Sequence, residues 1–301
     1  MHSTGQRQTC RLFLILPLLA LAAFSAAAQQ AQNPADLDID AGPPPDLVPT
    51  WRPVFQGVDY AEASREAPPV AVYAVRVDLK CPGIEFLATP SNGERPLDTD
   101  GQKTRAFLEE HGLQVAVNAS PYGPVEDIEG SPRDINGLNV SRGEVSSPAD
   151  ASHAALLIGR DNRVWFDTTP IEIAEAYNAI GGFGMLLKDG KNVGTRDKRH
   201  PRTAAGTSED GRYLYFVVID GRQPNHSIGT TTAETAAWIQ AFGTHDAINL
   251  DGGGSSTLVI EEGGKGKVMN RPIHNLIPGN ERVNGNNLGL KALPIETPAQ
   301  P

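Results

Sequence analysis

The stretch of the sequence with the clearest chemical content is AINLDGGGSSTLVI, residues 247–260. Two short apolar runs within it, residues 247–250 and 257–260, predict strands. Asp251 follows the first strand directly, and the glycines at 252–254 come next. Because glycine has no Cβ and tolerates positive φ, their backbone N–H groups can turn toward one point and bind an anion. A carboxylate beside such an anion site suits the cleavage of a phosphate-bearing bond.

Two structural alternatives stay open for this loop. A glycine-serine run can be a flexible turn within a hairpin, and Asp251 can cap the loop through its own backbone, as aspartate often does in turns. A nucleotide-binding P-loop is excluded, because no lysine follows the glycines in the G-x-x-x-x-G-K-[ST] pattern.

Further polar side chains follow or precede predicted strands. Asn118 and Asn249 come at strand ends, and Arg202, Arg222 and Arg271 lie in the turns around three others. Loops at the ends of rigid strands are where binding groups gather, and arginine offers phosphate a fork of donors that lysine cannot imitate. A single arginine is more often a surface or salt-bridging residue, and spacing alone does not show that the three converge.

The elements that must position these residues are mostly short strands. A helix is expected over residues 104–111, with Thr99 or Asp100 as its candidate cap and Gly112 as its stop. Residues 231–242 form the clearest helix, with a Thr231–Glu234 capping box. The strand at 84–89 is expected to pair with that at 70–79. These elements predict an α+β fold, a single domain of mixed or antiparallel sheet with few helices, whose short strands carry the site loops. Predicted strands span residues 70–79, 84–89, 113–117, 155–158, 164–166, 185–188, 203–207, 213–219, 247–250 and 257–260.

The two ends of the chain differ from its body. Residues 1–28 have two arginines, an apolar run and an A-x-A site, which is the layout of a secretory signal peptide and too short for a membrane span. Residues 29–53, rich in Pro and Ala, predict a linker, and 294–301 a disordered tail. Residues 54–293 then form the domain, and the mature chain has no membrane span.

The charge balance excludes some partners. The formal net charge is −10 for the full chain, and loss of Arg7 and Arg11 with the signal peptide makes it more negative. This argues against nucleic acid as a partner, although a local arginine pocket can still hold an anionic substrate. Cys81 is left alone by that cleavage, so no intrachain disulfide forms and the chain lacks the cysteine framework of many secreted domains. A periplasmic or secreted location is expected.

Histidine spacing gives no metal site. No H-E-x-x-H or similar pattern is present, so no cofactor is expected. A divalent ion held by Asp251 and backbone oxygens is the alternative left open.

With these segments in view, the chain resembles the phosphodiester glycosidase family, which includes the catalytic domain of the lysosomal uncovering enzyme. The resemblance extends over roughly residues 112–292. Its most specific string is INLDGGGSST, and the order of the other segments agrees. The matching segments are residues 180–191, 200–207, 217–222, 248–258, 270–272, 281–282 and 287–289.

Two departures from the family pattern bear on the sugar. The chain has Asn118-Ala119-Ser120 where the family has Asn-Gly or Asn-Ala and then aromatics, and Phe183 follows Gly182 where the family often has proline. Both positions, Asn118 and Gly182, belong to the expected sugar-binding region, so the resemblance defines the reaction better than the sugar.

The resemblance implies hydrolysis of a sugar-1-phosphodiester on envelope or extracellular glycans, which releases the sugar and leaves a phosphomonoester. Asp251 would be the base or nucleophile, and Glu281 a second carboxylate, unless it is a surface residue paired with Arg282. Asn118 and Asn249 would hydrogen-bond sugar hydroxyls or orient Asp251. The phosphate would be held by Arg202, Arg222, Arg271, the amides of Gly252, Gly253 and Gly254, and the hydroxyls of Ser255 and Ser256.

Two other functions compete with this one. The same groups would serve a phosphodiesterase that cleaves the P–O bond, and a non-catalytic periplasmic module would bind glycan without turnover.

Overall fold

The computed structural model describes residue 2 and residues 40–295, and this part of the chain is rich in β-sheet. It holds four sheets and two α-helices, and every strand pair in the sheets is antiparallel. The expectation of a sheet-dominated fold with few helices and short strands is confirmed. Within the described residues no helix is long and apolar enough to cross a membrane.

The first sheet carries most of the expected site segments. Its strands lie in the order β1-β2-β3-β17-β16-β18-β14-β15. Their bounds are β1 Arg52–Phe55, β2 Val58–Arg65, β3 Val70–Asp78, β14 Gly184–Lys188, β15 Lys191–Asn192, β16 Arg202–Thr207, β17 Tyr213–Ile219 and β18 Asp246–Asn249. Because β16 pairs Arg202 with Ile219 and Ala204 with Asn249, the start of β16 and the ends of β17 and β18 meet at one edge.

The remaining strands form three smaller sheets. One has the order β20-β19-β6-β21-β4, one β10-β9-β13-β11-β12, and one β5-β8-β7. Their bounds are β4 Glu85–Ala88, β5 Thr99–Asp100, β6 Val115–Asn118, β7 Tyr122–Gly123, β8 Pro132–Ile135, β9 Asn139–Ser141, β10 Glu144–Ser147, β11 Ala154–Ile158, β12 Val164–Asp167, β13 Asn178–Gly182, β19 Leu258–Glu262, β20 Lys265–Val268 and β21 Asn287–Lys291.

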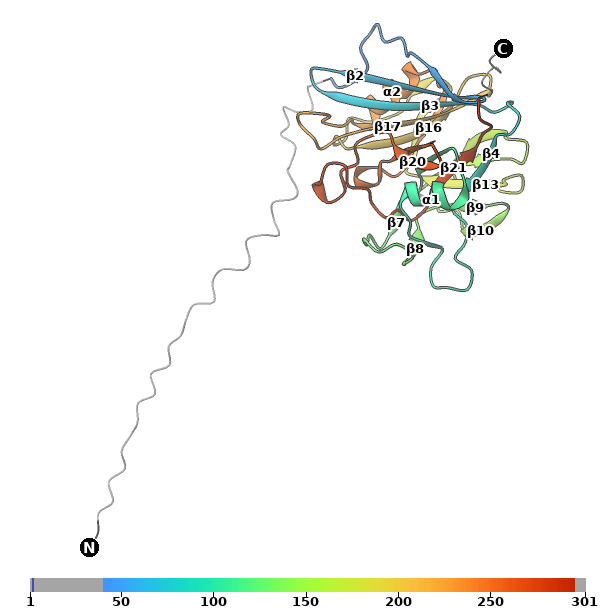
Figure 1. The fold of residues 1–301 in the computed structure, drawn as a ribbon, viewed down its shortest axis with the longest axis vertical. Helices are drawn as coiled ribbons and strands as arrows, with labels where there is room; N and C mark the ends of the chain where they lie inside the picture. The colour runs from blue at the N-terminus through green and yellow to red at the C-terminus, as the bar shows by residue number, and fades with distance from the viewer. Residues whose placement is uncertain (1, 3–39, 296–301) are drawn as a thin grey trace.

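Buried aliphatic side chains hold these layers together. The main core cluster takes residues such as Val75, Phe216 and Ile248 from the first sheet, and Val117 and Leu156 from the two five-stranded sheets. Figure 1 shows β2, β3, β17 and β16 in the upper half and β21, β4, β13 and β9 below them. The alternation of buried and less buried residues along β3 is the two-residue period that a strand with one core-facing side requires.

The helices follow their sequence signals closely. Helix α1 (Thr104–His111) ends, as expected, at Gly112, which adopts the left-handed conformation. The expected caps Thr99 and Asp100 are wrong, because the N-cap is Lys103, which makes no side-chain cap bond. In α2 (Thr232–Ala241) Thr231 and Glu234 form the predicted capping box.

Two further expectations need correction. The β4 strand pairs with β21, not with β3, whose neighbours are β2 and β17. Ordered packing also begins before the boundary expected at residue 54: Ala41 is fully buried, and its carbonyl accepts a 2.8 Å hydrogen bond from the Trp238 indole. Apart from residue 2, the expected signal peptide lies outside the described residues, as do residues 29–39 of the expected linker and 296–301 of the expected tail.

Candidate functional site

The glycine loop joins two sheets. It leaves β18 in the eight-stranded sheet and enters β19 in a five-stranded sheet, with a single 3₁₀ turn, η2 (Gly253–Ser255), between them. The alternative that it is a turn within a hairpin is therefore wrong. The real hairpin is β19–β20, which follows the loop.

Asn118 fastens this junction. Its side-chain amide donates to the Asp251 carbonyl at 2.6 Å, and its Oδ1 accepts from the Thr203 hydroxyl at 2.7 Å and from the Thr257 amide at 3.1 Å. These partners come from β16, the loop and the residue directly before β19. Because its side chain is fully buried and used in this way, Asn118 positions Asp251 and does not reach a sugar hydroxyl.

Asp251 itself lies in a largely desolvated position. Its backbone N–H donates to the Ala119 carbonyl at 2.8 Å, and one carboxylate oxygen accepts from the Gly252 amide at 3.0 Å. Desolvation by burial raises the pKa of Asp251 to about 6, while Ser255, Arg282 and Arg222 oppose the rise. A carboxyl with this pKa is ionised at neutral pH and is a stronger base than an exposed aspartate.

The glycines make room for other groups rather than forming an amide nest. The Gly252 amide is used by Asp251 and the Gly253 amide by the Pro201 carbonyl at 2.9 Å, so the prediction that these two amides bind phosphate is wrong. A Cβ on Gly252 would lie 2.7 Å from the Pro201 carbonyl oxygen. A Cβ on Gly254 would lie 2.5 Å from a guanidinium nitrogen of Arg282.

Two guanidinium groups thus lie against the loop. The Arg222 guanidinium packs against Gly253, which has a φ of 65° that suits glycine. A Cβ added at Gly253 would lie 3.1 Å from Nη2 of Arg222. Burial and the nearby positive charge of Arg282 lower the pKa of Arg222, whereas Asp251 raises it. The two arginines are therefore close enough to each other and to Asp251 to act on one anion.

The guanidinium groups are oriented by histidines. Arg222 Nη2 lies 3.1 Å from His200 Nδ1, and burial together with Arg222 lowers the pKa of His200 to about 4, so His200 is neutral and accepts this bond. On the other side Arg282 Nε donates to His274 Nδ1 at 2.9 Å. The other ring nitrogen of His274 is hydrogen-bonded to Asp127, which fixes the tautomer that accepts from Arg282.

Arg202 has a different task from the one expected. Its Nε donates to the Thr230 carbonyl at 3.0 Å, and its Nη2 bonds to Asp197 at 2.6 Å and to the Lys198 carbonyl at 2.8 Å. Arg202 therefore stabilises the segment before β16 through these bonds, and its guanidinium is not directed at the glycine loop. Of the arginines expected at the loop, the structure thus places Arg222 there and Arg202 elsewhere, and it adds Arg282.

The hydrogen bonds and ion pairs of Glu281 and Arg271 connect them to residues outside the glycine loop. Glu281 forms an ion pair with Arg105 at 3.0 Å, and burial raises its pKa. Among the described residues its carboxylate forms no hydrogen bond with Asp251 and no ion pair with Arg282, the surface partner considered for it. The exposed Arg271 is held by its backbone, since its amide donates to Asp220 and its carbonyl accepts from Gln223.

The other residues expected at the site have a packing role, a hydrogen bond to Arg282, or a buried polar atom without a partner. Gly182 packs its Cα against β18, where a Cβ would be 2.7 Å from the Asn249 carbonyl oxygen, so glycine is required for strand contact. Ser255 Oγ accepts from Arg282 at 3.3 Å. Asn249 Oδ1 and Ser256 Oγ are buried and find no hydrogen-bond partner in residues 40–295, which leaves both able to bind a ligand or water.

The structure adds residues that the sequence did not single out. Arg282 was weighed only as a surface partner of Glu281, and His274 was set aside because it shows no metal spacing. Tyr122 is also buried near Asp251, and its hydroxyl donates to the Val283 carbonyl at 2.7 Å. The only sequence signal for Arg282 was its place in a segment that matches the family. In the described part of the chain, no three His, Cys, Asp or Glu side chains are placed to hold a metal ion.

Comparison with known proteins places this site in a family. The model of the phosphodiester glycosidase family matches residues 111–291, which include both arginines and the whole glycine loop. The chain belongs to this family. A comparison with curated protein sequences gives no match.

Solved structures share the fold of this phosphodiester glycosidase domain. A hypothetical protein from Synechocystis has a TM-score of 0.61 at 14% identity, and the match covers 79% of this chain but only 64% of that one. The zebrafish N-acetylglucosamine-1-phosphodiester alpha-N-acetylglucosaminidase catalytic domain, auto-inhibited by its pro-peptide, has a TM-score of 0.56 at 18% identity, covering 83% and 86%. A putative exported protein from Burkholderia pseudomallei has 0.54 at 17%, covering 74% of each chain.

Proposed function

We propose that this chain hydrolyses a sugar-1-phosphodiester of envelope or extracellular glycans, releasing the sugar and leaving a phosphomonoester. One observation carries the proposal: a carboxyl with a pKa of about 6, Asp251, lies beside two guanidinium groups seated on adjacent glycines. Family membership supports the same class of reaction.

The chemistry follows from this arrangement. Arg222 and Arg282 hold the phosphate oxygens and stabilise the negative charge that grows on the leaving group as the C1–O bond breaks. Asp251 acts either as a base or as a nucleophile. As a base it takes a proton from water while the water oxygen bonds to C1; as a nucleophile it bonds to C1 itself, and water later displaces it. In both cases the electron pair of the broken bond goes to phosphate.

The test is a screen of the purified protein against p-nitrophenyl and other sugar-1-phosphodiesters, followed by hydrolysis in heavy-oxygen water. Label in the released sugar supports C1–O cleavage, and label in phosphate contradicts it in favour of a phosphodiesterase. Saturable binding with no turnover of any substrate would favour the glycan-binding module instead.

The proposed location is periplasmic or secreted, and it depends on the signal-peptide pattern of residues 1–28. Cell fractionation with N-terminal sequencing of the exported protein tests it. A protein found in the cytoplasm with its first 28 residues intact would contradict this location.

A further inference from the structure

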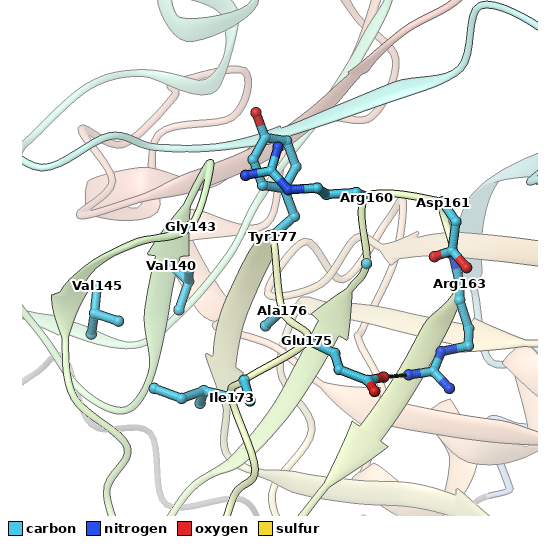
Figure 2. Close-up of a pocket in the computed structure, with 12 residues that line it drawn as sticks. Val140, Gly143, Val145, Arg160, Asp161, Arg163, Ile173, Glu175, Ala176 and Tyr177 are labelled. Carbon is cyan, nitrogen blue, oxygen red and sulfur yellow. Dashed lines mark hydrogen bonds and ion pairs between the residues drawn. The ribbon is translucent and has the colours of Figure 1, made fainter.

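A second hollow lies on the sheet that contains β13, at the opposite end of that strand from the glycine-loop site. Tyr177 precedes β13 and Gly182 ends it, so the two regions are separated by about 16 Å along the strand, at 3.3 Å per residue. The hollow is a cavity of about 740 Å³, and its apolar lining includes Val140, Val145 and Ile173. Figure 2 shows these side chains on one side of the cavity.

An arginine stacked on a tyrosine forms one wall. Figure 2 shows the Arg160 guanidinium against the Tyr177 ring. The guanidinium carbon lies 3.9 Å from the centre of the ring. The backbone around Tyr177 is fixed, because its N–H donates to Ile158 at 2.8 Å and its carbonyl accepts from Gly143 at 2.7 Å. Stacking fixes the plane of the guanidinium and leaves its N–H groups free at the edge, which suits an anion.

A second cavity of about 270 Å³ adjoins the stacked Arg160 and Tyr177 and is lined by several positively charged side chains. Arg142, Arg160 and Lys291 line it together, with Glu85 as its acidic member. Within residues 40–295 none of the three cations forms an ion pair with a carboxylate, although most arginines elsewhere in this acidic chain do so. Arg142 has a φ of 53°, a conformation that is unfavourable for a residue other than glycine.

The positive field of the cluster also acts on a neighbour. Burial lowers the pKa of His111, and Arg142 and Lys291 lower it further, against the opposing effect of Glu110. Arg142, in the turn after β9, and Lys291, in β21, thus act on one position, and Glu85 lies opposite Lys291 in the β21–β4 pair. The three cations are exposed and outnumber the one carboxylate of the cavity, so this patch attracts anions.

We propose that Arg142, Arg160 and Lys291 form a second binding site for a phosphate-bearing glycan, with the phosphate between the three cations and the adjoining sugar in the cavity over Val140 and Ile173. The choice of a phosphate-bearing glycan rests on the proposed function. A polymer held here has its next phosphodiesters within reach of the glycine-loop site, and this tethering raises their effective concentration at Asp251.

The experiment measures binding without turnover. In the full chain carrying Asp251→Asn, a phosphodiester-linked oligosaccharide is titrated by calorimetry, with dextran and polygalacturonate of equal length as neutral and carboxylate comparisons. Adding Arg142→Gln and Arg160→Gln should raise Kd for the oligosaccharide about tenfold or more, which corresponds to about 1.4 kcal/mol, because charge-assisted hydrogen bonds to the phosphate are lost. The matched control is Arg52→Gln, which removes one charge and one stack on a different tyrosine, Tyr60.

Several outcomes overturn the proposal: no binding of the phosphodiester glycan, an unchanged Kd in the pocket variants, or equal affinity for polygalacturonate. Loss of binding in an Arg222→Gln, Arg282→Gln chain with the pocket intact would also overturn it, by assigning the binding to the glycine-loop site. If no sugar phosphodiester is hydrolysed but the pocket variants lose binding, the proposed reaction fails and the second site stands. If turnover occurs and pocket variants bind normally, only the second site fails.

Discussion

Replacing Asp251 with asparagine should make the protein more stable while making it inactive. The carboxyl has a pKa raised from 3.8 to about 6 because burial disfavours its charged form. A shift of about two units corresponds to about 3 kcal/mol of cost to the folded state when the group is ionised. Asparagine removes the charge but needs a partner for its new amide, so the expected net gain is about 1–2 kcal/mol in the free energy of unfolding.

The gain must depend on pH in one direction. Because the folded-state pKa is the higher one, the native protein holds this proton between about pH 4 and 6, and the cost of ionisation grows across that window as pH rises. The Asp251→Asn protein should therefore be slightly less stable than the parent below pH 4, where only the cost of the new amide remains, and more stable than the parent at pH 8. For a chain of this size the difference corresponds to a Tm rise of about 2–8 °C.

Urea and thermal unfolding at pH 4 and pH 8 measure this, with Asp46→Asn, at an exposed position, as the control. In parallel, kcat/KM of the parent should fall below a pKa of about 6, and Asp251→Asn should lose about 10²–10⁴-fold in turnover. If Asp251 merely caps the loop, the variant would instead be destabilised at both pH values and keep its activity. That result would refute the assignment of Asp251 and the burial argument together.

Other substitutions separate the roles of the loop's neighbours. Arg202→Gln should lower the free energy of unfolding by about 1–2 kcal/mol, because it removes the ion pair with Asp197, with KM unchanged; a raised KM in a fully stable protein would contradict this. Gly254→Ala should displace Arg282 and raise KM for a sugar phosphodiester about tenfold or more, and normal kinetics would show that the guanidinium has no part in binding. His274→Asn, which keeps an acceptor near Nδ1, should retain more activity than His274→Phe, and equal losses would argue against orientation of Arg282. Dialysis against a chelator should leave turnover unchanged, and restoration by a divalent ion would contradict that.

The sequence predicted elements well where one local signal was enough. The helix at α2 was fixed by the Thr231–Glu234 box and the helix at α1 by Gly112, and β16–β17 by two apolar runs around a turn. Pairing between distant strands was not predictable in this way. The strand at 84–89 looked like a partner for its neighbour in sequence, but β21, some 200 residues later, supplies the actual partner.

The candidate site shows the same limit. Asp251 stood out because a carboxylate precedes three glycines; in the structure burial raises its pKa to about 6, and its role in the reaction stays a prediction. The glycines were read as amide donors, yet their missing side chains matter because arginines from remote segments occupy the space. Which of two arginines approaches a loop depends on side-chain direction and on partners such as Thr230 for Arg202 and His274 for Arg282, and a linear pattern contains neither.

The glycine loop connects two sheets, so the relative positions of the reacting groups depend on how the two sheets are placed against each other. Arg222 is delivered by one layer, Asn118 by the other, and Asp251 by the bridge, so a slide of less than an ångström between layers would misalign them. Substitutions deep in the shared core, far from any sugar, should then reduce turnover before they cause measurable unfolding. Selection for activity would in that case act on the packing of the interior as strongly as on the loop.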